Sequence, residues 1–107
     1  MSTKITVIYD NPLDPELFEK GYGDAQTSLV KVLPGLEGVE TSKVWPKEDG
    51  SATPAYRMID MYFADYDAAS IAVTTPEAAA LFSSIFDPAT GGVRILFSNI
   101  EKARTDR

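Results

Sequence analysis

The sequence contains no cysteine and no histidine among its 107 residues. The absence of cysteine excludes disulfide bonds, thiolate catalysis and metal sites built on sulfur ligands. The absence of histidine removes the side chain best suited to proton transfer near neutral pH, and also the usual ligand of haem and zinc. We therefore expect no bound metal and no cofactor, and we disfavour a haem enzyme.

Long apolar runs and clusters of positive charge are also missing. No run of residues approaches the ~20 apolar positions needed to cross a bilayer, and the N-terminus lacks the basic and then apolar pattern of a secretory signal. The net charge is −6 at pH 7, which repels phosphate backbones and anionic membranes. These absences predict a cytoplasmic protein that binds neither nucleic acid nor membrane.

The composition that remains is typical of a single globular domain. Hydrophobic residues make up 44% of the chain and charged residues 24%, values that argue against disorder. A chain of 107 residues is long enough for one core and too short for two. We expect one domain over residues 1–107, with a core at about 3–100 and a charged tail at 101–107.

The segment Asp14 to Leu36 carries the strongest local pattern in the chain. Asp14 can cap a helix, Pro15 suits the first helical position, and Pro34 with Gly35 marks the end. Between these signals, apolar side chains recur at spacings of three and four, which places them on one helical face. This stripe consists of Leu17, Phe18, Tyr22, Ala25, Leu29, Val32 and Leu33. The segment is therefore predicted to be an amphipathic helix packed on the core.

The rest of the chain alternates between strand and helix patterns. A second helical region runs from Asp67 to about Phe86 in two pieces, capped by Asp67 and then by Thr74 or Thr75. Strand patterns occupy Lys4–Asp10, Val39–Trp45, Tyr56–Phe63 and Val93–Asn99. The resulting order, β-α-β-β-α-β, predicts an α+β ferredoxin-like plait with both helical regions on one face of a four-stranded antiparallel sheet.

Neither face of the predicted strands is consistently polar. In the third strand, Ile59 and Met61 lie on one face, whereas Met58 and Tyr62 lie on the other. Helices cover one face of such a sheet, so apolar side chains on the open face need another partner. We predict a homodimer that associates through its sheet faces and encloses a shared interior.

Short motifs spread over most of the chain carry a family resemblance. They are, in order, Tyr9-Asp10-Asn11-Pro12, Leu33-Pro34-Gly35-Leu36, the strand 56–63, Asp65-Tyr66-Asp67-Ala68, Thr75-Pro76-Glu77 and Thr90-Gly91-Gly92-Val93. In order and spacing they resemble the EthD-domain family of the dimeric α+β barrel superfamily. The family often has a tyrosine and then His-x-Pro-Leu in its first helix, where this chain has Gln26-Thr27-Ser28-Leu29.

The resemblance implies a protein that acts on small hydrophobic compounds of aromatic, polyketide or ether type, in degradation or secondary metabolism. The superfamily includes oxygenases, cyclases and dehydratases that need no cofactor. The alternative is a non-catalytic ligand-binding or accessory dimer, which the loss of the helix histidine favours, because glutamine cannot exchange a proton near neutral pH. A structural dimer without a ligand is the third hypothesis.

The predicted ligand site lies between the first helix and the sheet. There Tyr22 and Gln26 would orient the oxygen atoms of a ligand, and the apolar lining would come from Leu29, Ile59, Met61 and Phe82. The catalytic candidates are Tyr22, Gln26 and Asp60, the last as a general base.

Each of these candidates also has a structural interpretation. Tyr22 can simply pack its ring, and Gln26 can lie at the exposed margin of the helix. Asp60 can be paired in the dimer interior with a cation such as Arg57 or Arg94, or with a hydroxyl group. The sequence leaves the two interpretations of each residue open.

Overall fold

Four strands form one antiparallel sheet in the computed structural model, which describes residues 2–23, 33–51, 53–86 and 90–101. The strands are β1 (Thr3–Tyr9), β2 (Gly38–Lys43), β3 (Arg57–Phe63) and β4 (Val93–Asn99). The helices of the described part are α1 (Pro15–Gly23), α3 (Tyr66–Ala72) and α4 (Pro76–Phe86). The strand order is β2-β3-β1-β4, with antiparallel pairs throughout. This topology confirms the predicted ferredoxin-like α+β plait.

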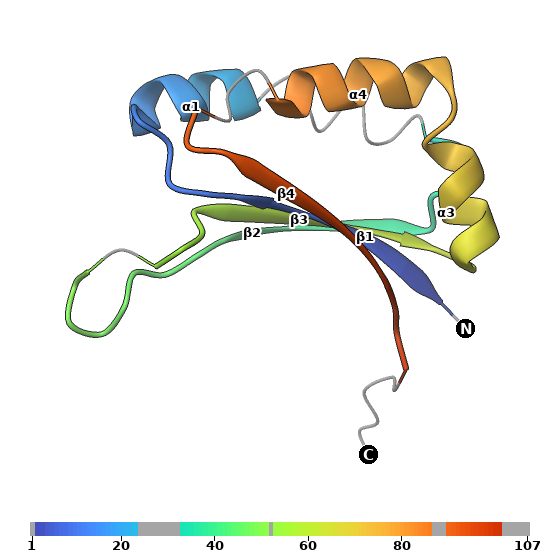
Figure 1. Cartoon of the computed structure of the whole chain (residues 1–107), viewed down its shortest axis with the longest axis horizontal. Coiled ribbons are helices and arrows are strands. Elements are labelled where there is room, and N and C mark those ends of the chain that lie inside the picture. The colour runs from blue at the N-terminus through green and yellow to red at the C-terminus, as the bar shows by residue number, and fades with distance from the viewer. Residues whose placement is uncertain (1, 24–32, 52, 87–89, 102–107) are drawn as a thin grey trace.

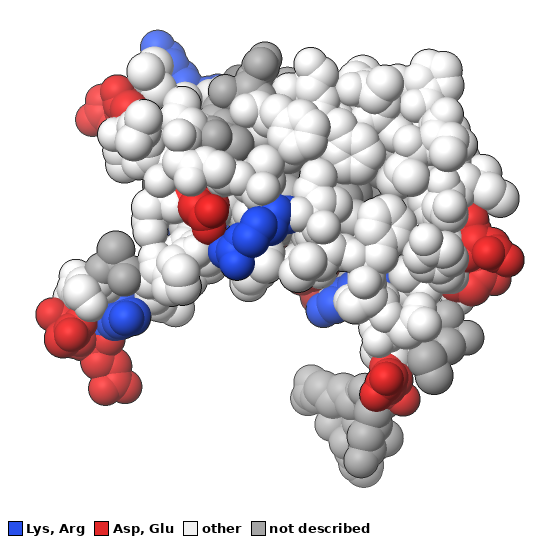
Figure 2. Space-filling view, in the orientation of Figure 1, with Lys and Arg blue, Asp and Glu red and all other residues white. Residues whose placement is uncertain are grey.

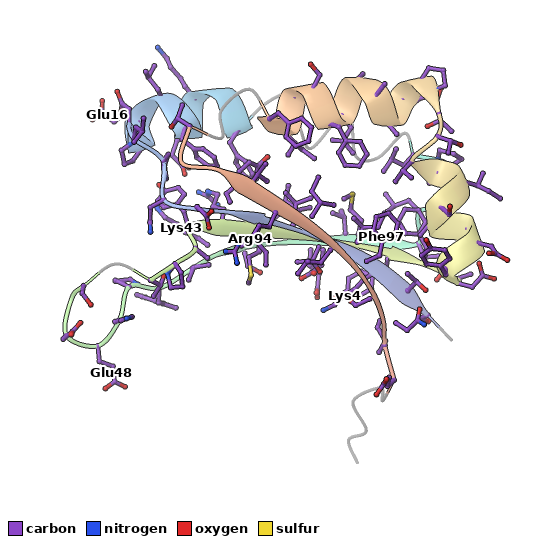
Figure 3. All side chains as sticks on the ribbon, in the orientation of Figure 1. Lys4, Glu16, Lys43, Glu48, Arg94 and Phe97 are labelled. Carbon is purple, nitrogen blue, oxygen red and sulfur yellow. The ribbon has the colours of Figure 1, made fainter. Side chains whose placement is uncertain are left out.

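The helices cover one face of the sheet and leave the other face open (Figure 1). Alternate side chains of β1 point toward the helices because successive residues of a strand face opposite sides. Side chains from the helices and from this face of the sheet fill the layer between them (Figure 3). The fully buried members of this core include Ile5, Val7, Tyr9, Phe18, Met61, Phe63, Leu81 and Ile85.

Helix α1 begins at the predicted cap. The Asp14 carboxylate accepts hydrogen bonds from the backbone N–H groups of Glu16 and Leu17, at 3.1 and 3.3 Å. These bonds satisfy donors that the first turn of a helix otherwise leaves unpaired. The second half of the predicted helix falls on residues 24–32, outside the described residues. The chain then turns at Pro34 and Gly35, where Gly35 has φ of +78°, as the sequence predicted.

The first piece of the second helical region begins earlier than predicted. Asp65, not Asp67, is the N-cap of α3, and its carboxylate accepts a hydrogen bond of 2.8 Å from the backbone N–H of Ala68. A cap residue needs extended backbone, which Asp65 has, whereas Asp67 already lies in the first turn. At α4 the cap is Thr75, whose hydroxyl accepts from the backbone N–H of Ala78 at 3.1 Å.

The open face of the sheet carries a mixture of apolar and charged side chains. Met58 and Tyr62 are half-buried on this face, and Leu96 is 52% exposed. Lys4 and Arg94 extend from the same face, away from the helices (Figure 3). In the space-filling view, the surface below the sheet is hollowed between the β2–β3 hairpin and the end of β4 (Figure 2). The open face of the sheet is therefore concave and partly apolar, as association through this face would require.

Candidate functional site

An aromatic cluster lies between α1 and one end of the sheet. It consists of Tyr9 from β1, Phe18 and Tyr22 from α1, and Tyr56, which immediately precedes β3. The ring of Phe18 contacts the other three, with centroid separations of 4.9 Å to Tyr9, 5.4 Å to Tyr22 and 5.2 Å to Tyr56. Edge-to-face and offset ring pairs of this kind are favourable. The cluster forms a rigid apolar wall beneath the first helix.

Tyr22, the predicted ligand-binding tyrosine, is half-buried in this cluster. Burial raises the pKa of Tyr22 above its ordinary value of 10.0, and the nearby Arg57 guanidinium opposes this shift in part. The phenol is therefore neutral across the physiological range. It can donate a hydrogen bond to a ligand oxygen, but unlike a histidine side chain it does not give up its proton near neutral pH.

A bidentate ion pair forms the polar edge of the cluster. The Arg57 guanidinium donates two hydrogen bonds to the Glu19 carboxylate, from Nε to Oε2 at 2.8 Å and from Nη2 to Oε1 at 2.6 Å. The same guanidinium lies 4.8 Å from the ring centroid of Tyr22. These hydrogen bonds raise the pKa of Arg57 and lower that of Glu19. Two α1 residues and one β3 residue are thereby fixed together.

Sequence reasoning missed this ion pair. The alternation of β3 correctly places Arg57 on the helix-facing side with Ile59 and Met61, but it does not reveal Glu19 as the partner. A signal was available, because the predicted helix places Glu19 one turn from Tyr22 at i and i+3. A cation and an anion that both border the same apolar face are candidates for a pair.

The remaining lining residues lie in different environments. Ile59 and Met61 are on the helix-facing side of β3, as predicted, with 2% and 0% of their surfaces exposed. Phe82 is half-buried on α4, and its ring stacks on that of Phe86 at 6.4 Å. Gln26 and Leu29 lie outside the described residues. The complete set of predicted lining residues therefore stays a prediction.

Asp60 lies on the opposite face of the sheet from Tyr22. Its carboxylate accepts a hydrogen bond of 2.6 Å from the Thr6 hydroxyl and lies 3.7 Å from the Lys4 ammonium group. The predictions of a hydroxyl partner and of a cationic partner are thus confirmed, but the cation is Lys4 and neither of the two arginines expected. Arg57 faces the opposite side of β3 from Asp60, and Arg94 is bonded to Asp10.

Two surface hollows lie near the aromatic cluster but are not lined by it. One, of about 440 Å³, is open to solvent and is bordered by Asp10, Asn11, Pro54 and Arg94. Its Arg94 side chain is already bonded to Asp10 at 2.8 Å and to the Pro54 carbonyl at 3.1 Å. The other, of about 350 Å³, lies on the β2–β3 hairpin beside Lys43, Val44, Trp45 and Pro46.

The described ranges hold neither a cluster of metal ligands nor a single helix fit to span a membrane. Over those ranges, no group of three or more aspartate or glutamate side chains is placed to hold a metal ion. Nor does any one helix there have the length and apolarity to cross a membrane. Helices α3 and α4 meet that test only jointly, with a bend of 80° between them.

The chain is similar to known proteins in sequence and in fold. No family model matches the chain. An uncharacterized 11.0 kDa protein in the thcB-thcC intergenic region of Rhodococcus erythropolis is 29% identical over 98 residues, which span 92% of this chain and 94% of the relative. A solved EthD family protein from Bacillus halodurans has a TM-score of 0.85 at 22% identity, covering 94% of this chain and 99% of the other.

The chain shares its fold with EthD family proteins. An EthD-like protein from Ralstonia eutropha has the same fold, with a TM-score of 0.73, 17% identity and coverage of 99% of this chain and 97% of the other. The predicted resemblance to the EthD family is thus confirmed for the fold.

The EthD fold also occurs in proteins described by an activity or an assembly. A hydroxynitrile lyase from Passiflora edulis has a TM-score of 0.71 at 14% identity and covers 97% of each chain. A cofactor-independent oxygenase from Streptomyces nogalater has a TM-score of 0.59 at 14% identity, with 98% and 97% coverage. A dimeric protein from Bacteroides fragilis has a TM-score of 0.66 at 12% identity, with 92% and 96% coverage. At these identities the likeness shows the fold alone.

Proposed function

We propose that this protein is an EthD-type homodimer that binds a small hydrophobic organic compound between α1 and the sheet. The observation that carries the proposal is the aromatic cluster with a polar edge, in which Tyr22 is only half-buried. Binding sites for small organic molecules are mostly apolar and aromatic, with a few polar groups that fix the orientation of the ligand. The cluster offers both kinds of group within one turn of α1.

The chemical character of the cluster favours a flat, oxygenated ligand. The half-buried ring of Tyr22 stacks on the buried ring of Phe18 with an interplanar angle of 18°, which holds the Tyr22 ring in place as a flat apolar surface for a ligand. The Tyr22 phenol supplies a neutral donor for a ligand oxygen. Gln26, one helical turn further along the sequence, would supply an amide donor and acceptor. Leu29, Ile59, Met61 and Phe82 complete the proposed lining.

A binding role fits these groups better than acid or base catalysis. The Tyr22 phenol is protonated near neutral pH, and the Glu19 carboxylate is hydrogen-bonded to Arg57 in the free protein. The alternative is a cofactor-independent oxygenase, cyclase or dehydratase, and the shared fold of a lyase and an oxygenase supports it. An oxygenase of this kind would need a substrate acidic enough to lose its proton to solvent, so that the resulting carbanion reacts with molecular oxygen, because neither the Tyr22 phenol nor the Gln26 amide takes up a proton near neutral pH.

The homodimer is proposed to form through the open face of the sheet. Its half-buried and exposed apolar side chains, among them Met58, Tyr62 and Leu96, would be covered by the same face of a second copy. Two proteins of the same fold that are described as dimeric support a homodimer. The predicted cytoplasmic location, the single domain over residues 1–107 and the absence of a cofactor stay predictions.

The proposed site is tested by ligand-induced thermal shifts. A bound ligand stabilises the native state according to the logarithm of its saturation, so aromatic and polyketide-like compounds should raise the melting temperature of the native protein. The shift should disappear in Tyr22→Leu, measured from that variant's own melting temperature. It should persist in Tyr66→Leu, since Tyr66 is 55% exposed on α3 beside Phe97, outside the site. Equal shifts in both variants would contradict the proposal.

A further inference from the structure

The Arg57 guanidinium is a mostly buried cation on the helix-facing side of the sheet, at the edge of the aromatic cluster. Its side chain is only 19% exposed, whereas its partner Glu19 is 37% exposed. Arg57 is held by the strand, because it belongs to β3 and pairs in register with Tyr9 of β1 and Lys43 of β2. The cation is therefore fixed at the polar edge of the aromatic cluster, and its carboxylate partner lies on the solvent side of it.

The ring of Tyr22 lies against this cation, and the ring of Tyr56 belongs to the same aromatic cluster. The guanidinium lies over the Tyr22 ring at 4.8 Å, and Tyr56 packs against the same group of rings at 5.2 Å from Phe18. Burial and a hydrogen bond to Glu19 raise the pKa of Tyr56. A planar guanidinium that stacks on an aromatic face keeps its fork directed at a carboxylate. The geometry suits a flat anion whose ring lies along the same wall.

The local charge balance is positive although the chain as a whole carries −6 at pH 7. Lys43 extends toward the same wall and places its ammonium group 5.5 Å from the ring centroid of Tyr56. In the described part of the chain, Glu19 is the one carboxylate bonded to Arg57. Among the described residues, two cations, Arg57 and Lys43, and one carboxylate, Glu19, therefore meet at the aromatic cluster.

We propose that Arg57 recognises a carboxylate group on the ligand, and that Glu19 occupies the guanidinium fork only until such a ligand displaces it. Exchanging one carboxylate for another leaves the charge of the site unchanged, so no new buried charge is created. The exchange needs the more exposed Glu19 to leave Arg57 and Tyr56 and rotate into water, and partly exposed ion pairs are weak enough to allow it.

This inference rests on the proposed function and names the ligand class, small aromatic carboxylates. The ring of such a ligand would lie against Tyr22 and Tyr56, and its carboxylate would take the two hydrogen bonds that Arg57 now gives to Glu19. Lys43 would add attraction at longer range. Neutral aromatic compounds would pack on the same rings but would not accept the two hydrogen bonds from Arg57, and they would therefore bind more weakly.

The test uses two probes that differ in one group, naphthoate and the naphthamide of the same substitution pattern, titrated by calorimetry. The native protein should bind naphthoate about tenfold more tightly than naphthamide. Arg57→Gln should abolish this preference, and Arg57→Lys, which keeps the charge but loses the fork, should reduce it. Glu19→Gln should strengthen naphthoate binding by a few-fold, because the competing carboxylate is gone. Arg94→Gln is the matched control, since Arg94 is paired with Asp10 on the open side of the sheet.

The outcomes separate this inference from the function on which it rests. Equal binding of the two probes to the native protein, or an unchanged preference in Arg57→Gln and Arg57→Lys, overturns carboxylate recognition and leaves the proposed aromatic site standing. Binding of neither probe to natively folded protein, as judged by circular dichroism, overturns both. Loss of preference in Arg94→Gln would also overturn the assignment to Arg57.

Discussion

The Thr6 hydroxyl donates a hydrogen bond of 2.6 Å to the Asp60 carboxylate across the central pair of strands. The Asp60 side chain is 15% exposed, and Lys4 lies 3.7 Å away on the same face. Asp60 therefore belongs to a polar group at the centre of the open sheet face. The aromatic cluster lies on the other side of the same sheet, so Asp60 and Tyr22 do not share a site.

Replacing Asp60 should change stability and leave ligand binding intact. Asp60→Ala leaves the Thr6 hydroxyl without its acceptor and should lower the free energy of unfolding by about 1–2 kcal/mol, measured by urea denaturation. Asp60→Asn, which keeps an acceptor oxygen, should lose less. The affinity for an aromatic ligand should match that of the native protein in both variants. A large loss of affinity in Asp60→Asn would instead place the carboxylate in the ligand site.

The ion pair between Glu19 and Arg57 should make stability depend on acidity. The Arg57 hydrogen bonds hold the pKa of Glu19 below its ordinary value of 4.5, so the unfolded chain binds this proton more readily than the folded protein. The stabilisation is thus fully present above pH 4.5 and is lost as the pH falls through the lower folded value.

The native protein and Glu19→Gln provide the comparison. At neutral pH the native protein should be more stable by about 1 kcal/mol or less, because the pair is partly exposed. In urea denaturation over a series of acidic buffers, this difference should shrink toward zero. A difference that grows as the pH falls would contradict the assignment.

Tyr62 should ionise only in strongly alkaline solution. Its hydroxyl donates a hydrogen bond of 2.6 Å to Glu40 on the open face, which raises the pKa of Tyr62 to about 12. The stabilisation from this bond is present below the ordinary value of 10.0 and is lost as the pH rises through about 12. Ultraviolet titration of the native protein against Tyr62→Phe should show this late step, and Glu40→Gln should move it toward 10.0. An unmoved step would rule out Glu40 as the cause.

Two glycines should respond oppositely to alanine. A Cβ atom on Gly91 would lie 2.7 Å from the backbone carbonyl carbon of Asn11, so the chain before β4 would have to move. Gly91→Ala should therefore lower the free energy of unfolding by about 2 kcal/mol or more. Gly38, in β2, has open space around the same position, and Gly38→Ala should be neutral or slightly stabilising. Equal effects in thermal denaturation would contradict the close approach at Asn11.

The proposed dimer should be sensitive to charge on the open face and insensitive to charge on α1. Leu96 and Leu17 are 52% and 65% exposed, but only Leu96 lies on the open sheet face. Leu96→Glu should shift the mass measured by light scattering from dimer to monomer, because an unpaired carboxylate would be buried in the interface. Leu17→Glu should leave the dimer mass unchanged. A native protein that is monomeric at micromolar concentration would remove the proposal.

The sheet could be predicted because its signals are local. Alternation fixed the faces of β1 and β3, and the Asp14 and Thr75 caps were readable from their neighbours in sequence. The predicted interior stripe of the first helix was less accurate, since Leu17 is 65% exposed. The spacing of Leu17 in the sequence places this residue near the apolar face of the helix, but α1 contacts the sheet through a narrower stripe around Phe18 and Tyr22.

The site was harder to predict because its contacts join distant parts of the chain. Glu19 and Arg57 are 38 residues apart, and only the packing of α1 on β3 brings them together. Arg57 could have been excluded as a partner of Asp60 from the sequence alone, since alternation places the two residues on opposite faces of β3. Nothing in the sequence distinguished the partners Thr6 and Lys4 before the register of β1 and β3 was known.

The most direct test of the proposed site is a crystal structure of the protein with an aromatic ligand selected by thermal shift. We predict ligand density on the helix-facing side of the sheet, with its ring against Tyr22 and Tyr56. Density confined to the open sheet face or to the hollow beside Arg94, with Tyr22 still packed as in the free protein, would contradict a binding site beneath α1.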